Sequence, residues 1–122
     1  MPALDLHDMY AEQLLLQNKV LQANGMKLEE LTHDQICFLV KNNALSTIDE
    51  CLEVVREFNW KLHKKYDNET FDKEKVLEEV VDVFKFWMNF LVYLNFSVDD
   101  FKKMFIKKSG IVEARFKKDF NA

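Results

Sequence analysis

Four acidic residues in the middle of the chain form two pairs, each with the spacing of about one helical turn. Glu50 and Glu53 lie three residues apart, and so do Glu79 and Asp82. Side chains three apart project from one face of a helix, so each pair would offer two carboxylates in one direction. Four converging carboxylates repel one another unless divalent cations lie between them, and Mg²⁺ prefers such oxygen ligands. The spacing therefore indicates a Mg²⁺ site, in which Mn²⁺ could substitute.

The two pairs differ in how strongly they argue for a metal. Acids three apart are ordinary on solvated helix faces, and Glu50 and Glu53 alone favour that interpretation. Glu79 and Asp82 instead interrupt a helix whose apolar residues cover most of its circumference, which predicts a central, buried helix. An unpaired carboxylate costs several kcal/mol to bury, so these acids should face something cationic. Together the pairs favour a metal site that could bind a triphosphate and direct a water at it.

Positioning the acids requires two helices that pack side by side, and the sequence predicts both. Thr32 begins a helical stretch with capping-box spacing that runs to Phe58, either unbroken or with a break near residues 42–43. Asp72 can cap the next helix, which runs to about Leu94. A short connection favours antiparallel packing of such neighbours, which would bring the two acidic pairs together.

Two further helices are expected on either side of this pair. The first covers residues 4–23 and ends at the stop signal Asn24-Gly25, while the last begins at Ser97 and either tolerates Gly110 or kinks there. Only two Gly and one Pro are present, too few turn residues for a many-stranded β protein. We therefore predict a single all-α domain over residues 1–122 with a four-helix, bundle-like core.

Composition restricts the partners and the setting. The net charge of −4 argues against a general nucleic-acid binder, although acids concentrate in residues 49–82 and Lys and Arg in residues 102–118. The longest apolar stretch, residues 83–96, is too short to span a bilayer, so no membrane association is expected. Two cysteines without a secretory signal do not predict a disulfide framework, so we expect a reduced, cytoplasmic protein.

The wider pattern resembles a known superfamily. E-x-x-E, about 25 intervening residues and then E-x-x-D is the signature of the all-α nucleoside triphosphate pyrophosphatases, which include MazG-like proteins and dimeric dUTPases. Residues 49–61 resemble the dimeric dUTPase stretch E-C-x-E-L-x-x-x-x-x-W-K, and residues 76–86 resemble its segment E-E-x-V-D-x-x-x-F. The resemblance extends from about Ala44 to Leu94 and is loose elsewhere.

This resemblance implies Mg²⁺-dependent hydrolysis between the α- and β-phosphates of a nucleoside triphosphate, most like the conversion of dUTP to dUMP and diphosphate. It implies that the metal ligands are Glu50, Glu53, Glu79 and Asp82. Glu50 would help to activate the attacking water, and Asp49 either shares this role or is simply solvated. A MazG-like enzyme with another or broader nucleotide range is the nearest alternative. A non-catalytic helical module that binds nucleotide or protein is the alternative of a different class.

Nucleoside contacts are carried over at four positions. The first helix resembles the uracil-contacting L-Q-x-x-L-N but reads L-Q-N-K-V-L, so Gln17 is kept while Leu21 replaces Asn. Gln17 is then either a uracil contact or a surface residue. Trp60 and Phe86 resemble aromatic residues that line the nucleoside pocket, with a place in the core as the alternative. Lys61 follows Trp60 as in the dimeric dUTPases and is expected near the substrate.

The last helix resembles the family pattern K-N-x-x-N-x-x-R-Q-x-x-G-Y in two positions. Lys108 and Arg115 keep its spacing, whereas Val112 replaces the second Asn. These two cations suit phosphate oxygens, or else belong to a solvated basic face. A domain this small with so many large apolar residues would expose a patch, and the resemblance is to dimers, so we expect a homodimer or a higher homo-oligomer.

Overall fold

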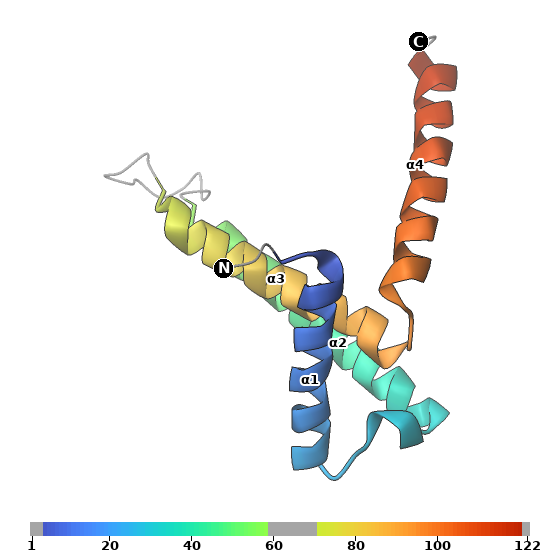
Figure 1. Ribbon diagram of the computed structural model, residues 1–122. Coiled ribbons are helices and arrows are strands. Elements are labelled where there is room, and N and C mark those ends of the chain that lie inside the picture. Colours follow the sequence, from blue (N-terminus) through green and yellow to red (C-terminus); the bar gives the residue numbers. More distant parts are fainter. Residues whose placement is uncertain (1–3, 59–70, 121–122) are drawn as a thin grey trace.

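The computed structural model describes residues 4–58 and 71–120, and within them the regular structure is helical (Figure 1). The elements in chain order are α1 (Leu6–Ala23), the short 3-10 helix η1 (Leu28–Glu30), α2 (His33–Arg56), α3 (Lys73–Tyr93) and α4 (Val98–Phe120). The prediction of an all-α, bundle-like fold is confirmed. None of these helices has the length and apolar character needed to cross a membrane.

Local capping explains where the helices begin. Thr32 and Gln35 form the expected capping box, in which the Thr32 hydroxyl accepts a hydrogen bond from the Gln35 backbone N–H at 3.2 Å. The carboxylate of Asp72 caps α3 by accepting hydrogen bonds from the backbone N–H groups of Glu74 and Lys75 at 3.0 and 3.3 Å. The first helix starts two residues later than expected because Asp5 forms its own capping box. No break occurs at residues 42–43, and the Asn43 side chain contacts α3 there.

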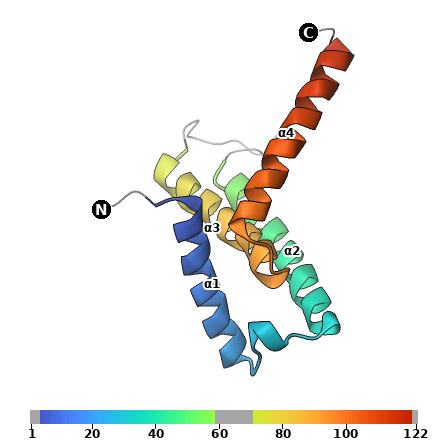
Figure 2. The ribbon, with the colours of Figure 1, turned by 45° about the vertical axis from the view of Figure 1, so that its right-hand side comes forward.

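Helices α2 and α3 form an antiparallel pair, which is the most extensive contact between elements of the described chain (Figures 1 and 2). The buried side chain of Asn43 fixes its register. Its amide nitrogen donates to the backbone carbonyl of Phe86 at 2.8 Å, and its amide oxygen accepts from Asn89 at 3.3 Å. A polar side chain buried in this way specifies one alignment of the two helices, since a shift would leave its hydrogen bonds unmade.

The core lies at the end of α3, where α1 and η1 close over it. Leu21, Leu39, Val92 and Tyr93 form its buried centre. The first half of α3 is different, because Leu77 is 63% exposed and Val80 and Val81 are also exposed. The expectation that α3 is buried throughout is therefore wrong for this half. Leu4 and Met9 line a pocket together with Val80 and Val81 and cover this side of α3 only in part.

Helix α4 leaves the bundle at an angle and extends beyond the other helices in both views (Figures 1 and 2). Asn95 turns the chain between α3 and α4 through the left-handed conformation, with a φ of 57°. Ser97 then begins α4 as expected, its hydroxyl accepting from the Asp100 N–H at 3.0 Å. The helix passes Gly110 without interruption, so of the two predicted alternatives it is the tolerated glycine that the structure shows.

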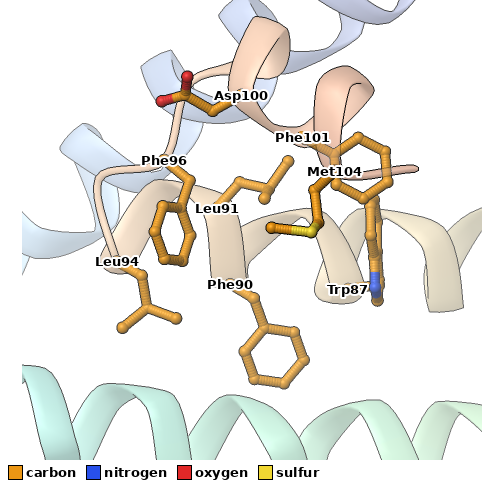
Figure 3. A pocket seen from close by; sticks show the side chains of 8 residues that line it. All are labelled: Trp87, Phe90, Leu91, Leu94, Phe96, Asp100, Phe101 and Met104. Atoms are coloured by element: carbon orange, nitrogen blue, oxygen red, sulfur yellow. The ribbon is translucent and has the colours of Figure 1, made fainter. Parts of the chain in front are cut away.

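The first turns of α4 anchor it to the bundle. Val98 is buried, and the ring of Phe101 meets Trp87 edge to face with 5.1 Å between centroids. His7 of α1 contacts the Asp99 carboxylate at 2.9 Å. An apolar pocket of about 350 Å³ remains between the end of α3 and this anchor (Figure 3). Its lining residues are Trp87, Phe90, Leu91, Leu94, Phe96, Asp100, Phe101 and Met104.

Candidate metal centre

The register of the α2–α3 pair brings acids of both helices together. Asn43 contacts Phe86 and Asn89 of α3. Glu50 lies seven residues after Asn43 in α2. Glu79 lies seven residues before Phe86 in α3, and Asp82 lies seven residues before Asn89. Seven residues are about two turns, so in antiparallel helices the same alignment repeats there. Carboxylate oxygens of Glu50, Glu79 and Asp82 accordingly lie within 4.8 Å of one another. We call these three residues the acid cluster.

Electrostatics make this cluster an unfavourable arrangement on its own. Burial raises the pKa of Glu50, and the charges of Asp82, Asp49 and Glu53 raise it further. Burial also raises the pKa of Glu79, with Asp82 as the strongest of several like-charged neighbours. The ion pairs within residues 4–58 and 71–120 leave the three cluster carboxylates without a cationic partner. A divalent cation would reverse each of these repulsions.

The fourth expected ligand is held differently. Glu53 forms an ion pair with Arg56, one turn further along α2, and its side chain is 40% exposed. An exposed pair of this kind contributes only about 0–1 kcal/mol, so it hardly opposes a move of Glu53 towards a bound cation. Asp49 is exposed, as its solvated alternative predicts, and lies beside Glu50 without belonging to the acid cluster.

The donor set of the acid cluster fits Mg²⁺. All three side chains offer carboxylate oxygen, the ligand type of a hard cation, and the cluster lacks the His or Cys donors that would favour Zn²⁺. Glu50 and Glu79 are half-buried, whereas Asp82 is exposed, so the cluster is open on one side. Mg²⁺ usually retains several waters or phosphate oxygens, and an open side leaves room for them.

Gln17 lies far from the acid cluster. It is 7% exposed, and its amide oxygen accepts a hydrogen bond from the Tyr93 hydroxyl at 2.6 Å. The surface alternative for Gln17 is therefore wrong. Tyr93 follows Asp82 by eleven residues, about 16 Å along α3, so this contact holds Gln17 at the other end of the helix.

The buried amide side chains between α1, α2 and α3 were not predicted from the sequence. The Gln13 amide donates to Asn89 at 2.7 Å, and Asn89 in turn donates to Asn43, so three buried side chains form one chain of hydrogen bonds. A signal for two of them was present, because Asn43 and Asn89 continue the seven-residue spacing of Glu50 and Asp82. Gln13 carried no comparable signal, because its contact joins residues 76 apart.

The remaining expected site residues are spread over the chain. Phe86 is half-buried and follows Asp82 by four residues, which places both on one face of α3. Trp60 and Lys61 lie outside the described residues. Lys108 and Arg115 are exposed on α4. The chain therefore assembles the α2 and α3 carboxylates but does not pair them with the cations of α4.

The helical fold and the acid cluster define a class, the all-α nucleoside triphosphate pyrophosphatases. Within it, a family model described as dUTPase matches residues 5–121, almost the entire chain. The chain belongs to the dUTPase family, and its all-helical structure fits the dimeric dUTPases. No curated protein and no solved structure matches the sequence. The expected family is thus confirmed, and it supports a hydrolase of the nucleotide pyrophosphatase type.

Proposed function

We propose that this protein is a Mg²⁺-dependent dUTP pyrophosphatase that converts dUTP and water to dUMP and diphosphate. The observation that carries the proposal is the convergence of Glu50, Glu79 and Asp82 within 4.8 Å in a chain that the dUTPase family model matches over residues 5–121. Three facing carboxylates that have no counter-charge among residues 4–58 and 71–120 are costly in a purely structural site. They are useful where a divalent cation and a triphosphate bind.

The proposed roles follow from position and charge. The acid cluster and Glu53 would hold Mg²⁺, which when bound screens the triphosphate charge and acidifies a neighbouring water. The raised pKa of Glu50 suits it to accept the proton of the attacking water. That water attacks the α-phosphorus, and the bond from this phosphorus to the bridging oxygen breaks. Diphosphate leaves with the electron pair, and dUMP retains the new oxygen.

We propose a homodimer as the working form. A row of large apolar side chains along α2 is exposed in the single chain, and its members recur every three to four residues or at twice that spacing. They are Phe38, Leu45, Ile48, Leu52 and Val55. A row of this extent on an isolated domain marks a surface that another protein covers, and a second copy is the partner that the family resemblance implies.

The test is diphosphate release from a panel of deoxynucleoside and ribonucleoside triphosphates with Mg²⁺. We expect selective turnover of dUTP, and Glu79→Gln should lower it by at least about 100-fold because a metal ligand supplies several kcal/mol. Glu78→Gln is the matched control, since Glu78 is exposed and adjacent but lies outside the acid cluster. It should retain activity within about twofold, as expected for a surface change.

Other results of this panel would replace the proposal. Turnover of several nucleotides would assign the protein to a broader MazG-like range, consistent with Leu21 and Val112 at positions where the family has Asn. If the folded protein releases no diphosphate from any nucleotide of the panel, a non-catalytic binding module would be favoured. Full activity of Glu79→Gln would show that the acid cluster is not the metal site.

A further inference from the structure

Three buried amide side chains, one from each of α1, α2 and α3, donate hydrogen bonds in a single direction. The Gln13 amide donates to Asn89 at 2.7 Å, and Asn89 donates to Asn43 at 3.3 Å. Asn43 completes the series by donating to the Phe86 backbone carbonyl at 2.8 Å. None of the three side chains is more than 5% exposed. We call Gln13, Asn89 and Asn43 the amide chain.

Stability alone does not require amides at these positions. A buried hydrogen bond gains little over the bonds that both groups make to water in the unfolded chain, and apolar side chains of the same shape are often as stable. A buried amide does provide specificity, because a misaligned packing leaves its donors and acceptors without partners. The amide chain therefore selects one arrangement of the helices.

Apolar contact alone would leave the alignment of α2 and α3 open. Apolar residues lie in nearly every turn of both helices, so a slide of one turn would exchange one apolar contact for another. Such a slide moves α2 along α3 by about 5.4 Å. Glu50 would then lose its place within 4.8 Å of Glu79 and Asp82. Two oxygens bound to one Mg²⁺ lie no more than about 4.2 Å apart, so a cation does not tolerate this shift.

Asn43 and Asn89 act on the acid cluster from a distance. Asn43 precedes Glu50 by seven residues, about 10.5 Å along α2, so its amide is too far away to bind the same cation. Asn89 follows Asp82 by the same interval in α3. The two amides thus meet two turns from the point where the carboxylates meet, and regular helices transmit the alignment between these points.

We propose that Asn43 and Asn89 are positioning residues of the acid cluster. Their hydrogen bonds hold Glu50 opposite Glu79 and Asp82, and Gln13 ties α1 to the same alignment. The ligand that benefits is a divalent cation, an assignment that rests on the proposed function. The amide chain thereby sets the affinity for the cation without contacting it.

Two destabilising substitutions on the same face of α2 separate positioning from stability. Asn43→Ala removes two hydrogen bonds of the Asn43 side chain, whereas Leu39→Val, one turn earlier, reduces core packing and leaves the amides in place. Both should lower the Tm. We expect only Asn43→Ala to weaken Mn²⁺ binding, by about tenfold or more, as measured by electron paramagnetic resonance of the free ion. Equal Mn²⁺ affinities of the two variants would overturn the proposal.

An amide-free chain provides the converse comparison. Gln13→Met, Asn43→Leu and Asn89→Leu together replace the amide chain with apolar side chains of similar size. We expect the Tm to stay at or above that of the wild type, because no buried amide is left without its partner. The Mn²⁺ affinity should nevertheless fall by about tenfold or more. Wild-type affinity in this folded variant would refute a positioning role.

Spin labels measure the alignment without a metal and so separate this proposal from the proposed function. One label is attached to the native Cys51 and one to Glu78→Cys, in a Cys37→Ala background and with an excess of unlabelled chain. These exposed positions adjoin Glu50 and Glu79. We expect one narrow distance distribution with the amide chain intact and a broad or shifted one in the amide-free chain, and identical distributions would overturn the proposal. If the amides set the distance but the native chain binds no Mn²⁺, only the proposed function fails.

Discussion

The pKa values of Glu50 and Glu79 are raised by burial first and by neighbouring like charges second. A carboxyl whose pKa is higher in the folded chain than in the unfolded chain favours folding when protonated. Without a cation, the two carboxyl groups therefore lower the free energy of unfolding as the pH rises from the ordinary pKa of 4.5 to above the raised pKa of the folded chain. A bound divalent cation favours the charged form instead, so that the free energy of unfolding then rises with pH.

We expect Mg²⁺ to raise the Tm at pH 7 and to lose this effect as the pH falls towards 4.5, because protons then compete with the metal. Scanning fluorimetry across this range measures it, with NaCl at matched ionic strength as the control. Glu79→Gln should start from a higher Tm than the wild type in the absence of Mg²⁺ and gain little when it is added. An equal rise of Tm with NaCl would exclude a specific site.

The close approach of Glu50, Glu79 and Asp82 could be predicted from the sequence, whereas the burial of the two glutamine amides could not. Glu79 and Asp82 stand out locally because they interrupt an apolar helix. The contact of Gln17 with Tyr93 joins residues 76 apart, and its existence depends on how α1 crosses α3. No local pattern states which faces of two amphipathic helices meet, so the burial of Gln17 and of Gln13 is visible only in the folded chain.

At the scale of the element, the α2–α3 pair should depend on Asn43. Asn43→Ala removes the partner of Asn89 and leaves its buried amide with one hydrogen bond fewer, which should reduce the free energy of unfolding by about 1–3 kcal/mol. The matched control is Asn42→Ala, at the exposed neighbouring position, with an expected change within about 0.5 kcal/mol. Urea titration measures both, and equal effects of the two substitutions would contradict a register-setting role.

Helix boundaries were well predicted, and helix burial was not. Thr32, Asp72 and Ser97 begin their helices through hydrogen bonds to residues two or three positions away, so the local sequence is sufficient. Burial of α3 instead depends on what covers it. Its apolar residues surround most of the helix, yet Leu77 is 63% exposed and Val80 is 46% exposed in the described part of the chain.

At the scale of the whole molecule, the exposed apolar rows on α2 and α4 predict that folding and self-association are linked. For a dimer that unfolds to two monomers, each tenfold increase in protein concentration should add about 1.4 kcal/mol to the apparent free energy of unfolding. Sedimentation velocity and thermal scans over a hundredfold concentration range would measure this. A concentration-independent Tm together with a monomeric sedimentation coefficient would contradict the dimer.

The direction of α4 could not be predicted from the sequence. The seven cations and the apolar residues of α4 indicate an amphipathic helix, but its path follows from the left-handed turn at Asn95 and from the packing of Phe101 on Trp87. The resemblance implies that Lys108 and Arg115 of α4 bind phosphate, yet among the described residues neither forms an ion pair with the acid cluster. Their separation is a property of the tertiary structure alone.

The seven-residue repeat of the α2–α3 pair makes it a scaffold on which a cation site can be moved by design. Two turns from Glu50, Glu79 and Asp82, the equivalent positions are Asn43, Phe86 and Asn89. Glu at the first two and Asp at the third would copy the acid cluster into the interior, where Asn43 and Asn89 are each only 4% exposed. Such a chain would carry two buried negative charges and a half-buried one, so its folding would require a divalent cation.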